Sequence, residues 1–199
     1  RRKDGHITVG FFKKRSGAIL VFFAVVILAS FFAANRSLSS KVQEINDLFS
    51  DGVYDPDRGY RLPSIRRQLE VRANASNNLL SLGRYFPESN SETEALSDVR
   101  TRLINGLSNS SGASKLYDIN KELDAAFNAL YKKLNMLTLT EKERDMADDL
   151  FNEWENTAAL IQKSRYNEAV REFSREVLSV FPTNYVMKFA LVNPPELFE

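Results

Sequence analysis

The longest apolar run in the chain lies near its N-terminus. Residues 16–35 form about twenty positions without a charged side chain. An α-helix rises about 1.5 Å per residue, so this run would cover about 30 Å, the thickness of the hydrocarbon core of a bilayer. The run therefore predicts a transmembrane helix. Leu38, Val42 and Ile45 follow at helical spacing, so we expect the same helix to continue beyond the membrane until Asp51.

Apolar residues recur at intervals of three and four along most of the remaining chain, which is the period of an amphipathic helix. Residues 51–63 interrupt this pattern, because Gly, Asp and Pro are dense there and favour a loop. Beyond the loop the pattern predicts four helices, which begin near Pro63, Ser91, Ser114 and Thr140. No segment shows the convincing alternation of apolar and polar residues that is typical of a β-strand.

Two of these helix starts carry a capping-box pattern, in which a hydroxyl and a carboxylate three residues later bond to free amides. The pairs are Ser91 with Glu94 and Thr140 with Glu143. We expect the last helix to run to about Phe181, because no Pro or Gly lies within it. Its predicted apolar stripe is Met146, Leu150, Trp154, Ala158, Ile161, Tyr166, Val170, Phe173, Val177 and Val180. The five-residue step after Ile161 breaks the period, so we expect the buried face to drift or the helix to bulge there.

Together these elements predict an all-α fold. An N-terminal transmembrane helix is followed by an elongated antiparallel bundle of four to five helices, because such a bundle buries one apolar stripe per helix. The expected domains are a short basic arm over residues 1–15, the membrane helix over 16–35 and the helical bundle over 36–199. No heptad seam is sustained enough to predict an oligomeric state.

Positive charge gathers on the N-terminal side of the apolar run. Six basic residues precede the run, and they are Arg1, Arg2, Lys3, Lys13, Lys14 and Arg15. By the positive-inside rule, the arm is cytoplasmic and residues 36–199 lie outside the cytoplasm. We therefore expect a single-pass protein of the cytoplasmic membrane. The alternative is a cleaved signal peptide, which we disfavour because the run exceeds a typical signal core and no Ala-x-Ala site precedes Asn35.

Composition narrows the chemistry of residues 36–199. They carry 21 basic and 25 acidic side chains, so no basic surface for nucleic acid is indicated. The chain has no Cys, and its only histidine is His6 in the arm, which removes Cys-His and Ser-His-Asp schemes. We find no phosphate-binding glycine loop. We expect no enzymatic activity, no cofactor and no small-molecule substrate, and the alternative is a site built only of carboxylates.

An acidic cluster marks the start of the last predicted helix. Its members are Glu141, Glu143, Asp145, Asp148 and Asp149. Carboxylates favour the positive end of a helix dipole, and we prefer this interpretation to a divalent-cation site because the spacing leaves the groups partly solvated. We therefore assign no metal ligand. Trp154 lies on the apolar stripe and is interpreted as a core residue.

The C-terminal stretch from Tyr166 to Phe173, followed by residues 181–184 and by the closing 196–199, resembles the signature end of the LemA family. Residues 72–80 and the helix containing Glu122 resemble the family more weakly, and the loop 51–63 resembles an insertion. The resemblance implies an N-terminal membrane helix joined to an elongated helical bundle. It implies no reaction.

The residues that carry the resemblance are also the candidate interaction residues. They are Tyr166, Asn167, Val170, Phe181, Pro182, Thr183 and Asn184. Tyr166 and Val170 fall on the apolar stripe, so we favour core packing over a recognition patch for them. We favour a helix stop over a docking motif for residues 181–184, because Pro restricts the residue before it. Residues 185–192 are apolar, and they either pack across the bundle or meet the membrane or a partner.

The functional hypothesis is a membrane-anchored, non-enzymatic scaffold or assembly protein at the bacterial cytoplasmic membrane. Its expected partners are the lipid bilayer, through residues 16–35, and other membrane proteins or a second copy of the chain. The alternative is a regulatory, non-catalytic subunit of a membrane enzyme such as a protease. A carboxylate-dependent hydrolase is a third hypothesis, and metal-dependent thermal stabilisation would support it.

Overall fold

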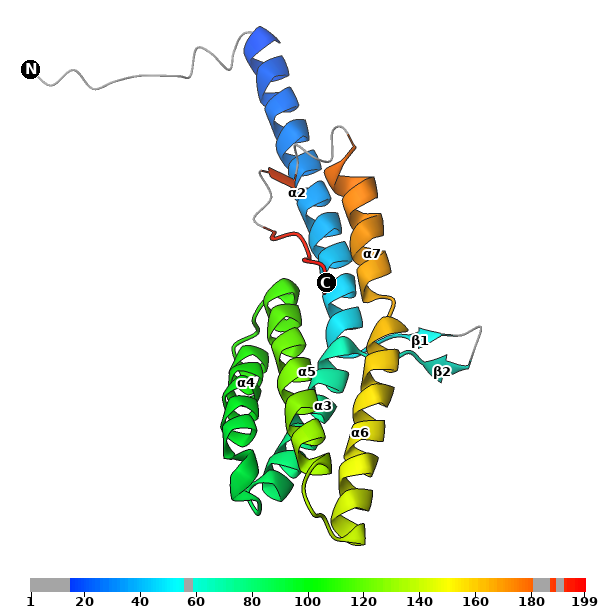
Figure 1. The fold of residues 1–199 in the computed structure, drawn as a ribbon. Helices are drawn as coiled ribbons and strands as arrows, with labels where there is room; N and C mark the ends of the chain where they lie inside the picture. The colour runs from blue at the N-terminus through cyan, green and yellow to red at the C-terminus, as the bar shows by residue number, and fades with distance from the viewer. Residues whose placement is uncertain (1–14, 56–58, 181–186, 189–191) are drawn as a thin grey trace, which may run out of the picture.

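The chain is a helical bundle with one long N-terminal helix in the computed structural model, which describes residues 15–55, 59–180, 187–188 and 192–199 (Figure 1). The helices are α2 (Arg15–Ser50), α3 (Ile65–Gly83), α4 (Asn90–Ser108), α5 (Ala113–Asn135), α6 (Glu141–Gln162) and α7 (Tyr166–Phe173). The short elements are the strands β1 (Tyr54–Asp55) and β2 (Tyr60–Arg61), the 3₁₀ turn η1 (Pro87–Ser89) and the π-helical turn η2 (Ser174–Leu178). The predicted all-α class is confirmed.

Helix α2 has two halves with opposite surroundings. In the first half, Ile19, Phe22 and Leu28 are each more than half exposed, although they are apolar. In the second half, Leu38 and Val42 are buried against the bundle. The helix is long and apolar enough to cross a membrane, as predicted, and it continues without a break into the bundle. At about 1.5 Å per residue its 36 residues extend over about 54 Å.

The core of the bundle lies among α3, α4, α5 and α6. Helix α4 packs on α3 and α5, and α3 also packs on α6. The largest fully buried side chains are Trp154, Phe127, Ile65, Leu69, Leu79, Leu96, Leu103, Leu116, Leu123, Leu130 and Leu134. Helices α3, α4 and α5 supply most of this set. Burying side chains of this size supplies about 1.5–3 kcal/mol each and drives the helices together.

The prediction of one continuous final helix is wrong, because the structure has two helices there. Helix α6 ends at Gln162 and α7 begins at Tyr166, with residues 163–165 between them. The end falls at the five-residue step, where one straight helix cannot keep Ile161 and Tyr166 on one face. The expected bulge occurs later, as η2.

The predicted apolar stripe of the final helix is also wrong in two places. Met146 is 42% exposed and Val180 is 47% exposed, although both were assigned to the stripe. Ala147 is fully buried instead of Met146, because steps of three and four lead back from Leu150 and Trp154 to position 147.

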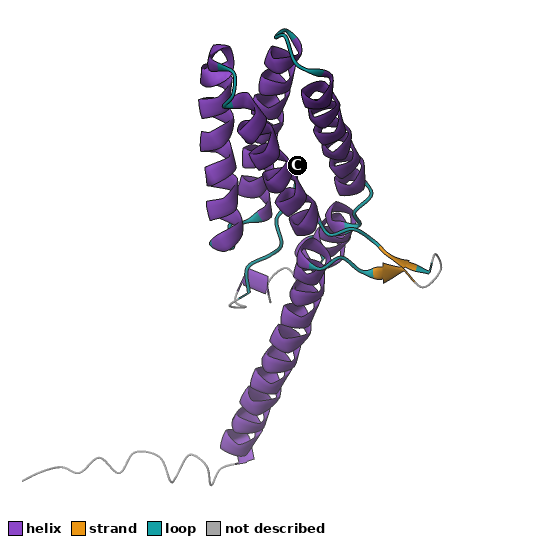
Figure 2. Cartoon of the chain, turned by 90° about the horizontal axis from the view of Figure 1, so that it is seen from below, coloured by secondary structure: helices purple, strands orange, loops and turns teal. Residues whose placement is uncertain are grey.

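The predicted loop 51–63 contains a small antiparallel hairpin, which the sequence did not indicate. Tyr54 pairs with Arg61 in it, and the hairpin projects from the side of the bundle (Figure 2). Gly52 before the first strand has a φ of 69°, and a Cβ there would lie 2.2 Å from the Leu62 carbonyl oxygen. Only glycine fits this turn.

One of the two predicted capping boxes forms. The Thr140 hydroxyl accepts from the Glu143 N–H, and the Glu143 carboxylate accepts from the Thr140 N–H. The Ser91 box does not form, because η1 precedes α4 and the helix begins at Asn90, with Ser89 rather than Ser91 as its N-cap residue. The buried Ser89 precedes it and donates its hydroxyl to the Gly83 carbonyl.

Candidate functional site

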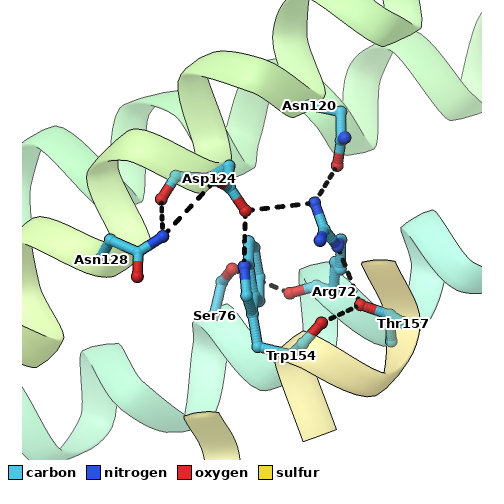
Figure 3. Close-up of polar contacts among 7 residues, drawn as sticks. All are labelled: Arg72, Ser76, Asn120, Asp124, Asn128, Trp154 and Thr157. Carbon is cyan, nitrogen blue, oxygen red and sulfur yellow. Dashed lines mark hydrogen bonds and ion pairs between the residues drawn. The ribbon is translucent and has the colours of Figure 1, made fainter. Parts of the chain in front are cut away.

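A buried arginine lies at the centre of the bundle. Arg72 of α3 is only 3% exposed, and the helices α5 and α6 supply the partners of its side chain (Figure 3). Its Nε donates to the Thr157 hydroxyl on α6 at 2.8 Å, and its Nη1 donates to Asn120 Oδ1 on α5 at 2.9 Å. The Asp124 carboxylate on α5 lies 3.5 Å from Nη1. The charge is therefore paired and hydrogen-bonded, as a buried charge must be.

Trp154 covers the arginine from α6. The guanidinium carbon lies 4.4 Å from the centre of the indole ring, and the indole N–H donates to Asp124 Oδ1 at 2.8 Å. The opposite face of the indole stacks on Phe127, with ring centres 3.9 Å apart. Burial lowers the pKa of Arg72, while the negative charges of Asp124 and Glu155 oppose that shift. The guanidinium stays protonated, because arginine begins far above neutral pH.

The C-terminal tail is fastened to α7 by two of the predicted candidate residues. The Tyr166 hydroxyl donates to the Glu196 carbonyl oxygen at 2.7 Å. The Asn167 amide donates to the Phe198 carbonyl and accepts from the Phe198 N–H, both at 2.8 Å. Phe198 is 4% exposed and contacts the ring of Phe49 on α2. These bonds fix the tail across the junction of α2 and α7.

The structure thus places three of the candidate interaction residues together. Tyr166 and Val170 are buried, which confirms core packing, and Asn167 holds the tail of the same chain. The other four candidates, residues 181–184, lie outside the described residues. Of the apolar segment 185–192, the described Met187 is buried.

Replacing Asn167 with alanine is expected to release the tail. The variant loses both hydrogen bonds to Phe198, and each contributes about 0.5–1.5 kcal/mol. The amide of Phe198 should therefore exchange with solvent at least tenfold faster, as measured by hydrogen exchange on the full chain in micelles. The exposed Asn152 on α6 is the control, and Asn152→Ala should leave this rate unchanged. Equal exchange rates of the Phe198 amide in wild type and Asn167→Ala would contradict the role of Asn167 in holding the tail.

Tyr166 is expected to make stability depend on alkaline pH. Burial, with a smaller contribution from the charge of Glu196, raises the pKa of Tyr166 to about 12, whereas an unfolded tyrosine titrates near 10. The folded state holds the proton more tightly, so this contribution is fully present below pH 10 and is lost between about pH 10 and 12. Urea unfolding measured at about pH 9 and at about pH 11.5 gives the change in the free energy of unfolding between the two. This free energy should fall less for Tyr166→Phe than for wild type. An identical loss would refute this assignment.

A pocket of about 790 Å³ opens beside the buried arginine, at the junction of α6 and α7. Arg72 and Asn120 line it from the bundle, and Phe198 lines it from the tail. The remaining lining residues are Leu62, Tyr117, Ala158, Ile161, Gln162, Lys163, Ser164, Arg165, Asn167, Glu168 and Arg171. Four of the lining side chains are basic and one is acidic, and Asp124 and Glu199 pair with Arg72 and Arg171 from outside the lining.

Sequence reasoning assigned no role to Arg72, Asn120 or Thr157. A signal was present, because Leu69, Arg72 and Ser76 follow one another at helical spacing and place two polar residues on a buried face.

The acidic cluster at the start of α6 was weighed as a metal site in the sequence. Among the described residues, no three His, Asp or Glu side chains gather into a group that could hold a metal ion.

Comparisons with protein-family models, with curated proteins and with solved structures gave no match to this chain.

Proposed function

We propose that this chain is a membrane-anchored, non-enzymatic helical-bundle protein that works by contact with other membrane proteins or with a second copy. The observation that carries the proposal is the single helix α2, whose exposed apolar half leads directly into a half that packs on the bundle. Exposed apolar surface of this extent is costly in water and favourable in lipid. The bilayer is therefore the first partner.

The bundle is joined to its anchor without a flexible link. Helices α3 and α7 both pack on the second half of α2. The ring of Phe49 lies 5.1 Å from that of Tyr166, and Lys41 forms an ion pair with Glu176 at 3.3 Å. A body fixed in this way would present the same faces at a constant height above the membrane, which suits a scaffold or an assembly factor.

The residue types available support contact rather than catalysis. Residues 36–199 contain neither Cys nor His, the side chains that most often act as nucleophile or general base near neutral pH. The buried polar cluster around Arg72 joins α3 to α5 and α6, and the charge of Arg72 is balanced within it by Asp124. The resemblance of residues 166–173 and 196–199 to the LemA family supports the same proposal. Those residues fasten the tail.

The orientation in the membrane is tested with one engineered thiol. The chain has no cysteine, so Ser110→Cys places a unique thiol in the turn between α4 and α5. We expect a membrane-impermeant maleimide to label this variant in intact cells, because the bundle is proposed to lie outside the cytoplasm. A cysteine at Gly5, in the arm, is the matched control and should be labelled only after lysis. The reverse pattern would place the bundle in the cytoplasm.

The partner is sought by crosslinking in the membrane and purification in mild detergent. Recovery of other membrane proteins or of crosslinked copies supports the scaffold. One stoichiometric enzyme partner would favour the regulatory alternative. A purified chain that turned over a substrate, and lost this activity on replacement of one acidic residue, would contradict the proposed function.

A further inference from the structure

The floor of the pocket at the α6–α7 junction is polar and buried. Arg72 is 3% exposed and Asn120 is 9% exposed, and both line the pocket. The hydrogen bonds of the guanidinium to Thr157 and Asn120 come from Nε and Nη1. Neither these bonds nor the ion pair with Asp124 uses Nη2. An arginine fixed by its neighbours on one side is a rigid donor on the other.

The rim of the pocket is basic. Lys163, Arg165 and Arg171 surround the opening, and Glu168 is the only acidic residue of the lining. Arg165 pairs with Glu168 and Arg171 with Glu199, but all four side chains are about half exposed or more, so these pairs are weak. Lys163 forms no ion pair with any residue that the structure describes.

The start of α7 adds backbone donors to the same rim. Arg165 is the N-cap residue of this eight-residue helix, and no side chain caps it. The first N–H groups of a helix have no partner within the helix, and its dipole places partial positive charge there. Ser164, Arg165 and Asn167 all line the pocket, so this helix end borders the opening. Helix starts of this kind bind phosphate and carboxylate groups.

We propose that this pocket binds a small molecule that carries a phosphate or carboxylate group. Its anionic group is held between Arg72 at the floor and Lys163 and Arg165 at the rim, because guanidinium groups and amides recognise these oxygens. The rest of the molecule lies along Leu62 and Ile161. The volume of about 790 Å³ falls in the range of pockets that enclose small ligands, about 300–1,000 Å³.

The height of the pocket above the membrane argues for a diffusible ligand. The Phe49 ring touches Tyr166 at the start of α7, so the pocket lies level with the end of α2. The predicted membrane segment ends at Asn35, and the intervening residues of the helix rise by about 21 Å. A lipid headgroup in the same bilayer does not reach that far.

The test titrates the full chain in zwitterionic micelles with pyrophosphate and, separately, with citrate. Trp154 is the only tryptophan and lies against Arg72, so its indole N–H resonance reports on the pocket floor. We expect at least one anion to shift this resonance in a saturable way. Pyrophosphate alone would identify a phosphate ligand, and citrate alone would identify a carboxylate ligand.

Variants at the exposed rim locate the binding. Lys163→Gln and Arg165→Gln should each lower the affinity for the anion about tenfold, the equivalent of about 1.4 kcal/mol. Lys142→Gln, at the exposed opposite end of α6, is the matched control and should bind like wild type. An unchanged thermal transition shows that each variant is folded. The proposal is overturned if neither anion shifts the resonance, or if the rim variants bind as tightly as the Lys142 control.

Discussion

Replacing Trp154 with alanine should lower the free energy of unfolding of the bundle by about 3–5 kcal/mol. The side chain is fully buried, and its removal leaves a cavity between α3, α5 and α6. It also ends the stacking on Phe127 and uncovers the guanidinium of Arg72. Asp124 loses the indole donor as well. All of these losses act in the same direction.

The measurement is urea unfolding of the full chain in micelles, followed by the far-ultraviolet helix signal, since the variant has no tryptophan fluorescence. Tyr85→Ala is the control, because this aromatic side chain is 79% exposed at the turn after α3. It should change the free energy of unfolding by less than about 0.5 kcal/mol. A Trp154→Ala variant as stable as the Tyr85→Ala control would show that the packing described for α6 is wrong.

Replacing Arg72 with alanine should lower the free energy of unfolding by about 3 kcal/mol. The variant leaves the Asn120 and Thr157 acceptors without their donor and opens a space beneath Trp154. The cost stays below that of a fully enclosed ion pair, because the Asp124 side chain is 47% exposed and water can solvate it. Arginine therefore contributes through its fixed hydrogen bonds and its volume more than through charge attraction.

Arg72→Lys distinguishes geometry from charge. Lysine keeps the charge but has no planar fork with which to reach two acceptors at once, so its loss of stability should lie between those of wild type and Arg72→Ala. Urea unfolding of Arg72→Lys and Arg72→Ala measures the contribution of the fork geometry separately from that of the charge. A double-mutant cycle with Trp154→Phe measures the coupling between Arg72 and the indole. If Arg72→Ala unfolds at the same urea concentration as wild type, the buried cluster does not hold the helices together.

The local features of the fold could be predicted from the sequence, because each depends on neighbours in the chain. The uncharged run over residues 16–35 and the Thr140 capping box are of this kind. The Ser91 box had the same local pattern, but Pro87 starts a 3₁₀ turn and Ser89 takes the position before the helix. A local motif is displaced when the preceding residues already form a turn.

The site could be predicted only in part, because its contacts join distant segments. Thr157 lies 85 residues after Arg72, and Phe198 lies 31 residues after Asn167. Periodicity identified Tyr166 and Val170 as buried residues, yet it says nothing about which segment covers them. The pocket depends on the end of α6 at Gln162. The irregular step after Ile161 marked that place without revealing that the helix stops there.

The most direct test of the account is whether the full chain stays in the membrane after washing at alkaline pH with carbonate, which removes proteins held only by surface contacts. We expect the chain to remain in the membrane pellet, and to move to the supernatant only when detergent is added, because about twenty residues of α2 are proposed to lie in lipid. Release of the intact full-length chain by carbonate alone would contradict the account.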